Sequence, residues 1–140
     1  MCPVYINRIA SIHAESSNEK PYFSAQEPDY KEMITNANLR RRMSRMIKMG
    51  VACGLECMKD ILPEKVDAII TATGLGCLAD TEKFMNALMD NREQMPNPTA
   101  FIQSTFNTIG AQIALLLKIH AYNVTYVPVS YTHLRAHETT

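Results

Sequence analysis

A short glycine motif follows an apolar run and could bring the backbone close to a phosphate. The motif, Gly74-x-Gly76-x-x-Ala79, comes directly after Val66–Thr73 and before a helix that we predict from about Asp80 to Asp90. This order formally matches the dinucleotide-binding fingerprint, in which a pyrophosphate approaches a helix amino terminus. Such a unit also needs a second strand with an acidic residue roughly 20 residues beyond the glycines. A proline-containing loop occupies that place here, so the pattern favours a tight turn that packs a strand against a helix.

The thiols and imidazoles of the chain lack the spacing of a complete metal site. Cys53 and Cys57 lie four residues apart on a predicted helix, where two thiolates supply half of a zinc site at most. In a chain of this size, we interpret the cysteines as reduced and mostly buried. His13 and His120 are interpreted as structural or surface residues. We therefore predict no metal and no cofactor. The four cysteines are Cys2, Cys53, Cys57 and Cys77.

Three cations, Arg41, Arg45 and Lys48, share one face of a predicted helix. Such a face could dock a phosphopantetheine group or an acidic carrier, although a solvated helix face has the same pattern, and we favour the latter. The formal net charge is zero, which gives no electrostatic basis for binding nucleic acid or an anionic membrane. The sequence has neither an apolar run of membrane-spanning length nor a signal-peptide pattern, so we predict a cytoplasmic protein.

The first half of the chain contains the elements that must position these residues. Val4–Ile12 alternates apolar and polar side chains and predicts a half-buried strand. Leu39–Ile61 repeats apolar residues at helical spacing, and its small residues Gly50 and Gly54 predict a close approach to another element. Val66–Thr73 is continuously apolar and β-branched, which is typical of a strand covered on both faces.

The second half is organised around Asn97–Val127, which we interpret as a loop, a helix and a strand. Thr108–His120 keeps helical spacing with apolar residues on two faces and predicts a mostly buried helix. Asn123–Val127 alternates as a strand. Strands and helices therefore interleave along the chain, and this order predicts an α/β layered domain.

Three segments of the chain resemble the β-ketoacyl-ACP synthase, or condensing-enzyme, family with the thiolase fold. They are MSRMIKMGVACGLECMKDI, DAIITATGLGCLADT and NPTAFIQSTFNTIGAQIALLL, and their order and spacing match those of the family over most of Met1–Val127. The resemblance implies an α/β fold that is the incomplete amino-terminal half of a thiolase-like layered fold.

The resemblance also implies where the chemistry of the family would lie. In that family a short strand leads into a sharp elbow, where a nucleophilic cysteine begins another buried helix and two later histidines assist decarboxylative condensation. The nucleophile would fall near position 130, where this chain has Ser130. Two departures lie upstream: Lys118-Ile119-His120-Ala121 stands where the family usually has a Gly-x-x-Gly turn, and the last strand ends in bulky residues.

The carboxyl-terminal residues have a different character. Val129–Thr139 reads VSYTHLRAHET, which turns polar and histidine-rich where the resemblance implies a buried helix. This segment resembles the translation, in one reading frame, of the transposon-end adapter used in shotgun sequencing. We therefore predict an authentic domain at residues 1–127 and a non-native, adapter-derived tail at residues 128–140.

The adapter interpretation removes two motifs from consideration. His133 and His137 have the spacing of a metal-binding pair on a helix. Residues translated from an adapter were not selected to bind a metal, so we do not interpret them as ligands. Ser130 at the implied nucleophile position would likewise be accidental.

Three hypotheses for function follow. The first is a truncated β-ketoacyl synthase-like protein, whose parent condenses carrier-bound acyl and malonyl groups in fatty-acid or polyketide-type synthesis. By resemblance, Thr105 and Phe106 would lie near the acyl pocket and the dimer contact without being catalytic. The partners would be an acyl carrier protein and a second condensing-enzyme subunit, in a homodimer or heterodimer. The second hypothesis is a non-catalytic chain-length partner, and the third is a small dinucleotide-binding α/β protein.

The first hypothesis predicts that the chain alone is inactive, because it has neither the elbow cysteine nor the two later histidines. It also predicts poor solubility or a loosely packed state, since truncation would leave sheet edges and apolar surface exposed.

Overall fold

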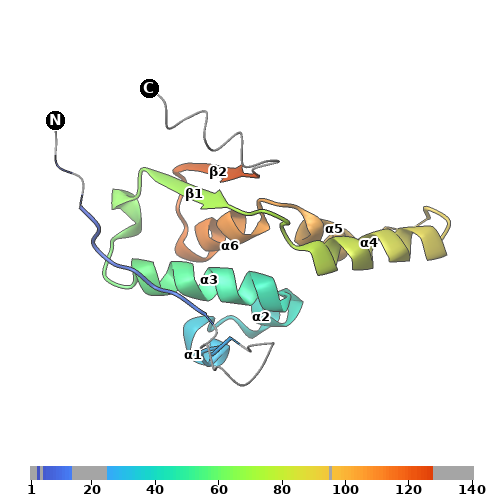
Figure 1. Ribbon diagram of the computed structural model, residues 1–140, viewed down its shortest axis with the longest axis horizontal. Coiled ribbons are helices and arrows are strands. Elements are labelled where there is room, and N and C mark those ends of the chain that lie inside the picture. Colours follow the sequence, from blue (N-terminus) through green and yellow to red (C-terminus); the bar gives the residue numbers. More distant parts are fainter. Residues whose placement is uncertain (1–2, 4, 14–24, 95, 128–140) are drawn as a thin grey trace, which may run out of the picture.

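The computed structural model describes residues 3, 5–13, 25–94 and 96–127. In chain order, its elements are α1 (Tyr30–Met33), α2 (Ala37–Arg42), α3 (Arg45–Met58), the 3-10 helix η1 (Pro63–Lys65), β1 (Ala68–Ala72), α4 (Leu78–Asp90), α5 (Pro98–Ser104), α6 (Thr108–Leu117) and β2 (Tyr122–Tyr126). Within these described ranges the tertiary structure is layered, with α6 lying between α3 and a sheet of β1 and β2 (Figure 1). The prediction of an α/β layered domain is therefore confirmed.

The two strands run parallel, and α6 is part of the crossover that connects them. Ala68 pairs with Tyr122 and Ala72 with Tyr126, so the strands are in register over their whole length. Parallel strands need such a crossover because the chain must return to the same end of the sheet. The first and last residues of both strands lie within one or two residues of the predicted bounds.

The core forms where α3 meets α1 and α6. Its buried members are Ile34, Met43, Ile47, Val51, Cys77 and Ile113. Most of the predicted apolar stripe of Leu39–Ile61 therefore faces the interior, but Met46, one of its residues, is 53% exposed. The glycines on this helix permit close packing: a Cβ at Gly50 would come within 2.8 Å of Ile109 of α6. This confirms that small residues bring the helix close to another element.

The predicted strand at Val4–Ile12 is wrong for its described residues, 5–12, which contain no strand. This segment instead crosses α3 (Figure 1), and Arg8 forms ion pairs with Glu56 and Asp60 of that helix. Alternating apolar and polar residues suit any extended segment laid on a surface, so periodicity alone does not establish sheet pairing.

The helices differ from the prediction in two places. The stretch predicted as one helix over Leu39–Ile61 is divided into α2 and α3, because Met43 and Ser44 adopt extended conformations between them. Helix α5 occupies residues that we interpreted as a loop. It begins at Pro98, with the side chain of Asn97 accepting a hydrogen bond from the Thr99 N–H (3.0 Å), which is a favourable helix start.

Helices α4 and α5 pack against each other in a hairpin that extends away from the sheet (Figure 1). The rings of Phe84 and Phe101 lie 5.6 Å apart between centroids, and the Thr81 hydroxyl donates to the Ser104 carbonyl (3.1 Å). Much of the apolar surface of the hairpin faces outward, including Met89, which is 72% exposed.

Only one face of the sheet is covered by a described element, which corrects the prediction that β1 is covered on both faces. Ile69 packs against the core, whereas Ile70 on the opposite face is 66% exposed. Successive residues of a strand point to opposite faces, and α6 covers only the face of Ile69 and Thr71. Tyr122 and Tyr126 of β2 are also exposed.

Residues 128–140, with Ser130, His133 and His137, lie outside the described residues, as does Cys2. In the part of the chain that the structure describes, no single helix has the length and apolar character needed to span a membrane. The pair α5 and α6 meets those criteria together but is bent by 107°.

Candidate functional site

The carboxyl ends of the two parallel strands lie together and define the candidate site. The N–H of Thr73, just after β1, donates to the carbonyl of Tyr126 at the end of β2 (3.0 Å). In open α/β sheets, ligands bind at the carboxyl ends of strands, where the loops converge. The glycine turn and the chain segment after β2 therefore both lie at the edge of the sheet where such folds bind ligands.

The glycine motif forms a tight turn, as predicted. Gly76 has a φ of 60°, a left-handed conformation that favours glycine, and its N–H donates to the Thr73 hydroxyl oxygen (2.9 Å). Our sequence analysis did not single out Thr73, although a threonine that begins a glycine turn commonly closes it in this way.

The ring of Phe106 lies directly against this turn. A Cβ at Gly76 would be 2.7 Å from Cε1 of Phe106. The aromatic side chain thus fills the space beside the glycine that a pyrophosphate would need in a dinucleotide site. Phe106 remains 50% exposed, so one side of its ring is available at the site. Its predicted contact with an acyl substrate stays a prediction.

Thr105, the other predicted substrate-binding residue, uses its hydroxyl within the turn between α5 and α6. This hydroxyl donates to the Ile102 carbonyl (2.9 Å) and lies 2.8 Å from the hydroxyl of the buried Thr108. The Thr108 hydroxyl also donates to the Ile102 carbonyl. Thr105 therefore holds the loop that presents Phe106, and a direct role in binding stays a prediction.

Among the described cysteines, Cys77 is the one that directly follows the glycine turn, at the amino terminus of α4. Its side chain is buried (4% exposed), and this burial, followed by the nearby Asp80 carboxylate, raises the pKa of its thiol. A nucleophilic cysteine needs an accessible thiolate. Cys77 is therefore a structural core residue. Cys53 and Cys57 are only half-buried, so among the described cysteines the interpretation of a buried thiol holds for Cys77 alone.

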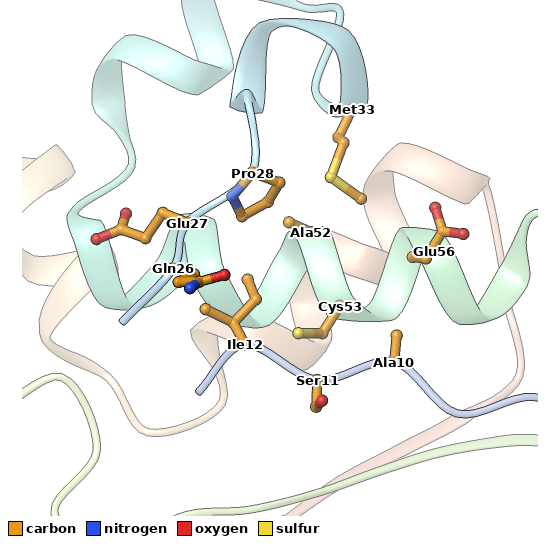
Figure 2. Close-up of a pocket in the computed structure, with 10 residues that line it drawn as sticks. All are labelled: Ala10, Ser11, Ile12, Gln26, Glu27, Pro28, Met33, Ala52, Cys53 and Glu56. Carbon is orange, nitrogen blue, oxygen red and sulfur yellow. The ribbon is translucent and has the colours of Figure 1, made fainter. Parts of the chain in front are cut away.

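Cys53 lies beside a separate cavity of about 440 Å³ between the amino-terminal segment and α3 (Figure 2). Its lining combines apolar residues such as Ile12, Met33 and Ala52 with the polar side chains of Ser11, Gln26, Glu27 and Glu56. Burial, and then the neighbouring Cys57, raise the pKa of Cys53, so its thiol is not activated. Across the described ranges, no group of three or more His, Cys, Asp or Glu side chains could hold a metal ion.

The basic face predicted from Arg41, Arg45 and Lys48 is only partly present in the structure. Arg45 does not belong to it, because Arg45 forms an ion pair with Glu27 (Nε to Oε1, 2.5 Å). Arg41 and Lys48 instead line a depression with two further cations, Lys31 and Arg40. The contribution of Lys31 was not visible in the helical periodicity because it belongs to α1, a different element.

Two comparisons find related proteins, and a third finds none. The family model described as the N-terminal domain of β-ketoacyl synthases matches residues 13–127. Among solved structures, the chain is similar to a ketosynthase (ApeO) in complex with its chain length factor (ApeC) from Xenorhabdus doucetiae, with a TM-score of 0.59 and 20% sequence identity. That similarity covers 83% of this chain and 46% of the other. No curated protein matches the sequence. At this identity the structural likeness shows the fold, which is thiolase-like, as the resemblance implied.

Proposed function

Because the chain belongs to the β-ketoacyl synthase family, we propose that it forms the amino-terminal half of a condensing acyltransferase. The reaction would join carrier-bound acyl and malonyl groups in fatty-acid or polyketide-type synthesis, in the cytoplasm. Its partners would be an acyl carrier protein and a second condensing-enzyme subunit.

The observation that carries this proposal is the hydrogen bond from the Thr73 N–H to the Tyr126 carbonyl (3.0 Å). It holds the exit of β2 beside the glycine turn and the half-exposed ring of Phe106. A nucleophile that follows β2 after a sharp elbow would therefore emerge next to an apolar wall. Such a wall suits an acyl chain, since burial of apolar surface drives its binding.

Within this proposal, Phe106 contributes the apolar wall and Thr105 holds its loop. Neither residue carries out the chemistry. The cysteine at this edge, Cys77, is buried and not activated. We therefore expect the 140-residue chain to have no condensing activity by itself, and we propose residues 1–127 as the family domain and residues 128–140 as an adapter-derived tail.

The decisive experiment is to read the source DNA across and beyond codon 127 from an independently prepared library. We expect codons 128–140 to be replaced by others, with a cysteine codon at the elbow and two histidine codons further on. The complete product should then condense acyl and malonyl groups on a carrier protein. The tail assignment is wrong if the VSYTHLRAHET codons persist in genomic DNA, and absence of condensing activity from the complete product rules out the enzyme.

A non-catalytic chain-length partner is the second candidate, and the bulk of Tyr126 at the end of β2 favours it. This side chain is 59% exposed where small residues usually precede the nucleophile. The exposed apolar surface of α4 and α5 also supports pairing with another subunit. A residue other than cysteine at the elbow, together with activity only in a mixture with a cysteine-containing partner, would establish this role.

Dinucleotide binding, the third hypothesis, has no support from the geometry, because Phe106 fills the space beside Gly76. Micromolar affinity for NAD(P) in an equilibrium binding assay would restore it.

A further inference from the structure

A basic pocket lies on the side of α3 that is remote from the sheet. It has a volume of about 280 Å³ and forms where the start of α1 meets α2 and α3. Figure 1 shows α1 on one side of α3 and α6 and the strands on the other, with α2 at the amino-terminal end of α3. The residues that line this pocket are Pro28, Asp29, Tyr30, Lys31, Arg40, Arg41 and Lys48.

The charges of the pocket are unbalanced. Four cationic side chains from three helices surround it, and Asp29 is the one carboxylate among the described residues that line it. Among the described residues, none of these four cations forms an ion pair. Like charges gathered at one place raise the free energy of the fold unless an anion neutralises them.

The nearest carboxylates are already engaged elsewhere. Asp29 accepts a hydrogen bond from the Lys31 N–H (2.8 Å) as the amino-terminal cap of α1. Glu27 accepts one from Arg45 Nε (2.5 Å) and one from the Tyr30 hydroxyl (2.6 Å). Asp29 and Glu27 still carry charge, and Glu27 acts on Lys48 through space. The described residues of the pocket nevertheless keep four cations against one lining carboxylate.

One cation is fixed in place by the fold. Arg40 donates from Nη1 to the Ile34 carbonyl (2.5 Å), and Ile34 is a buried core residue. The guanidinium is therefore held before any ligand arrives, which lowers the entropic cost of binding. Arg41 is exposed, and none of its guanidinium donors is used by another described residue.

We propose that this pocket binds a phosphate group. A phosphate presents several strong acceptor oxygens, which match the planar donor fork of arginine and the ammonium groups of lysine. The pocket volume of about 280 Å³ is large enough for a phosphate group. The site is separate from the strand ends, so phosphate binding is an additional property of the fold.

Two sources could supply this phosphate. One is a free phosphorylated metabolite, and the other is the phosphate of a phosphopantetheine arm. The second source rests on the proposed function, whereas the first does not.

Titration calorimetry on the 140-residue chain tests the proposal with three probes: inorganic phosphate, phosphopantetheine and phosphate-free pantetheine. We expect saturable phosphate binding that weakens about tenfold in the double variant Arg41→Gln/Lys48→Gln, which removes two charge-assisted contacts. The matched control is Lys65→Gln/Lys83→Gln, which removes two exposed cations outside the pocket and should leave the affinity unchanged.

The probes also separate the sources. Equal affinity for phosphate and phosphopantetheine supports a free metabolite, whereas tighter binding of phosphopantetheine that depends on Arg41 and Lys48 supports the carrier arm. The proposal is overturned if phosphate does not bind saturably at millimolar concentration, or if both double variants lose affinity equally. Circular dichroism of each variant establishes that its fold is retained. Such a failure would leave the proposed condensing function intact, because that function is tested through the codons after β2.

Discussion

Ile113 of α6 lies directly against Gly54 of α3. A Cβ at Gly54 would come within 2.5 Å of Cδ1 and 3.0 Å of Cγ1 of Ile113. The two helices approach this closely because glycine has no side chain at the crossing. Since α6 also packs on both strands, this contact sets the distance between the core helix α3 and the sheet.

We predict that Gly54→Ala destabilises the fold by about 1–3 kcal/mol, the usual cost of forcing an extra methyl into a packed core. Urea denaturation followed by circular dichroism would measure this loss. Gly74→Ala is the matched control, because a Cβ at Gly74 would meet nothing within 4 Å. Adding Ile113→Val, which removes Cδ1, should restore part of the stability. Equal losses for Gly54→Ala and Gly74→Ala would contradict the role of this helix contact.

The turn at Gly76 combines backbone strain with a side-chain clash. A non-glycine residue at its φ of 60° costs about 1–2 kcal/mol, and the added Cβ would also collide with Phe106. We predict that Gly76→Ala is destabilising and that Phe106→Ala in the same chain relieves only the collision. The same denaturation assay distinguishes the two contributions. Complete recovery in the double variant would show that the backbone conformation carries no cost.

Lys118 ends α6 in a left-handed conformation, with a φ of 55°. This is the first position of the segment where the related family usually has a Gly-x-x-Gly turn. Glycine adopts the conformation without strain, so we predict that Lys118→Gly stabilises the fold by about 1 kcal/mol. Lys118→Ala removes the same charge but keeps a Cβ, and it should give no gain in the urea midpoint. Equal stabilisation by both variants would point to the charge instead.

The contact of Glu27 with Tyr30 and Arg45 predicts a pH dependence. The hydrogen bond from Tyr30, followed by that from Arg45, lowers the pKa of Glu27 below its ordinary value of 4.5. The contribution of the ionised Glu27 carboxylate to the stability of the fold is therefore fully present above pH 4.5. It is lost as the pH falls through the lowered pKa of Glu27. We predict that Glu27→Gln flattens this part of the acid unfolding curve. Glu64→Gln, at an exposed carboxylate of η1, should leave the curve unchanged.

The uncovered face of the sheet predicts low solubility. Ile70 and Tyr122 are each 66% exposed on neighbouring strands, and adjacent exposed apolar residues promote association. We predict that Ile70→Thr/Tyr122→Thr raises the soluble fraction and reduces dye binding to apolar surface, without lowering the urea midpoint. Ile69→Thr, one residue away but packed against the core, should lower the midpoint by contrast. An unchanged soluble fraction in the double variant would locate the association elsewhere.

Residue periodicity was sufficient to predict the elements that are long and strongly patterned. The apolar stripe of α3, the β-branched run of β1 and the helix α6 all lie close to their predicted positions. The predicted burial of α6 on two faces is wrong for its second face, because Leu115 is 62% exposed. Periodicity failed for the segment of Val4–Ile12, where ion pairs of Arg8 replace strand pairing. It also failed for α5, whose start depends on the local cap provided by Asn97.

The sequence by itself determined the α/β class, the tight glycine turn and the family resemblance, because these depend on residue types at short spacing. Only the tertiary structure decided that Phe106 covers Gly76, that the ends of β1 and β2 are joined through Thr73 and Tyr126, and that Lys31 joins the basic pocket. These contacts link residues that are far apart in the chain. The first two depend on how α6 packs between α3 and the strands, and the third depends on how α1 packs against α2 and α3. Local sequence patterns do not determine this packing.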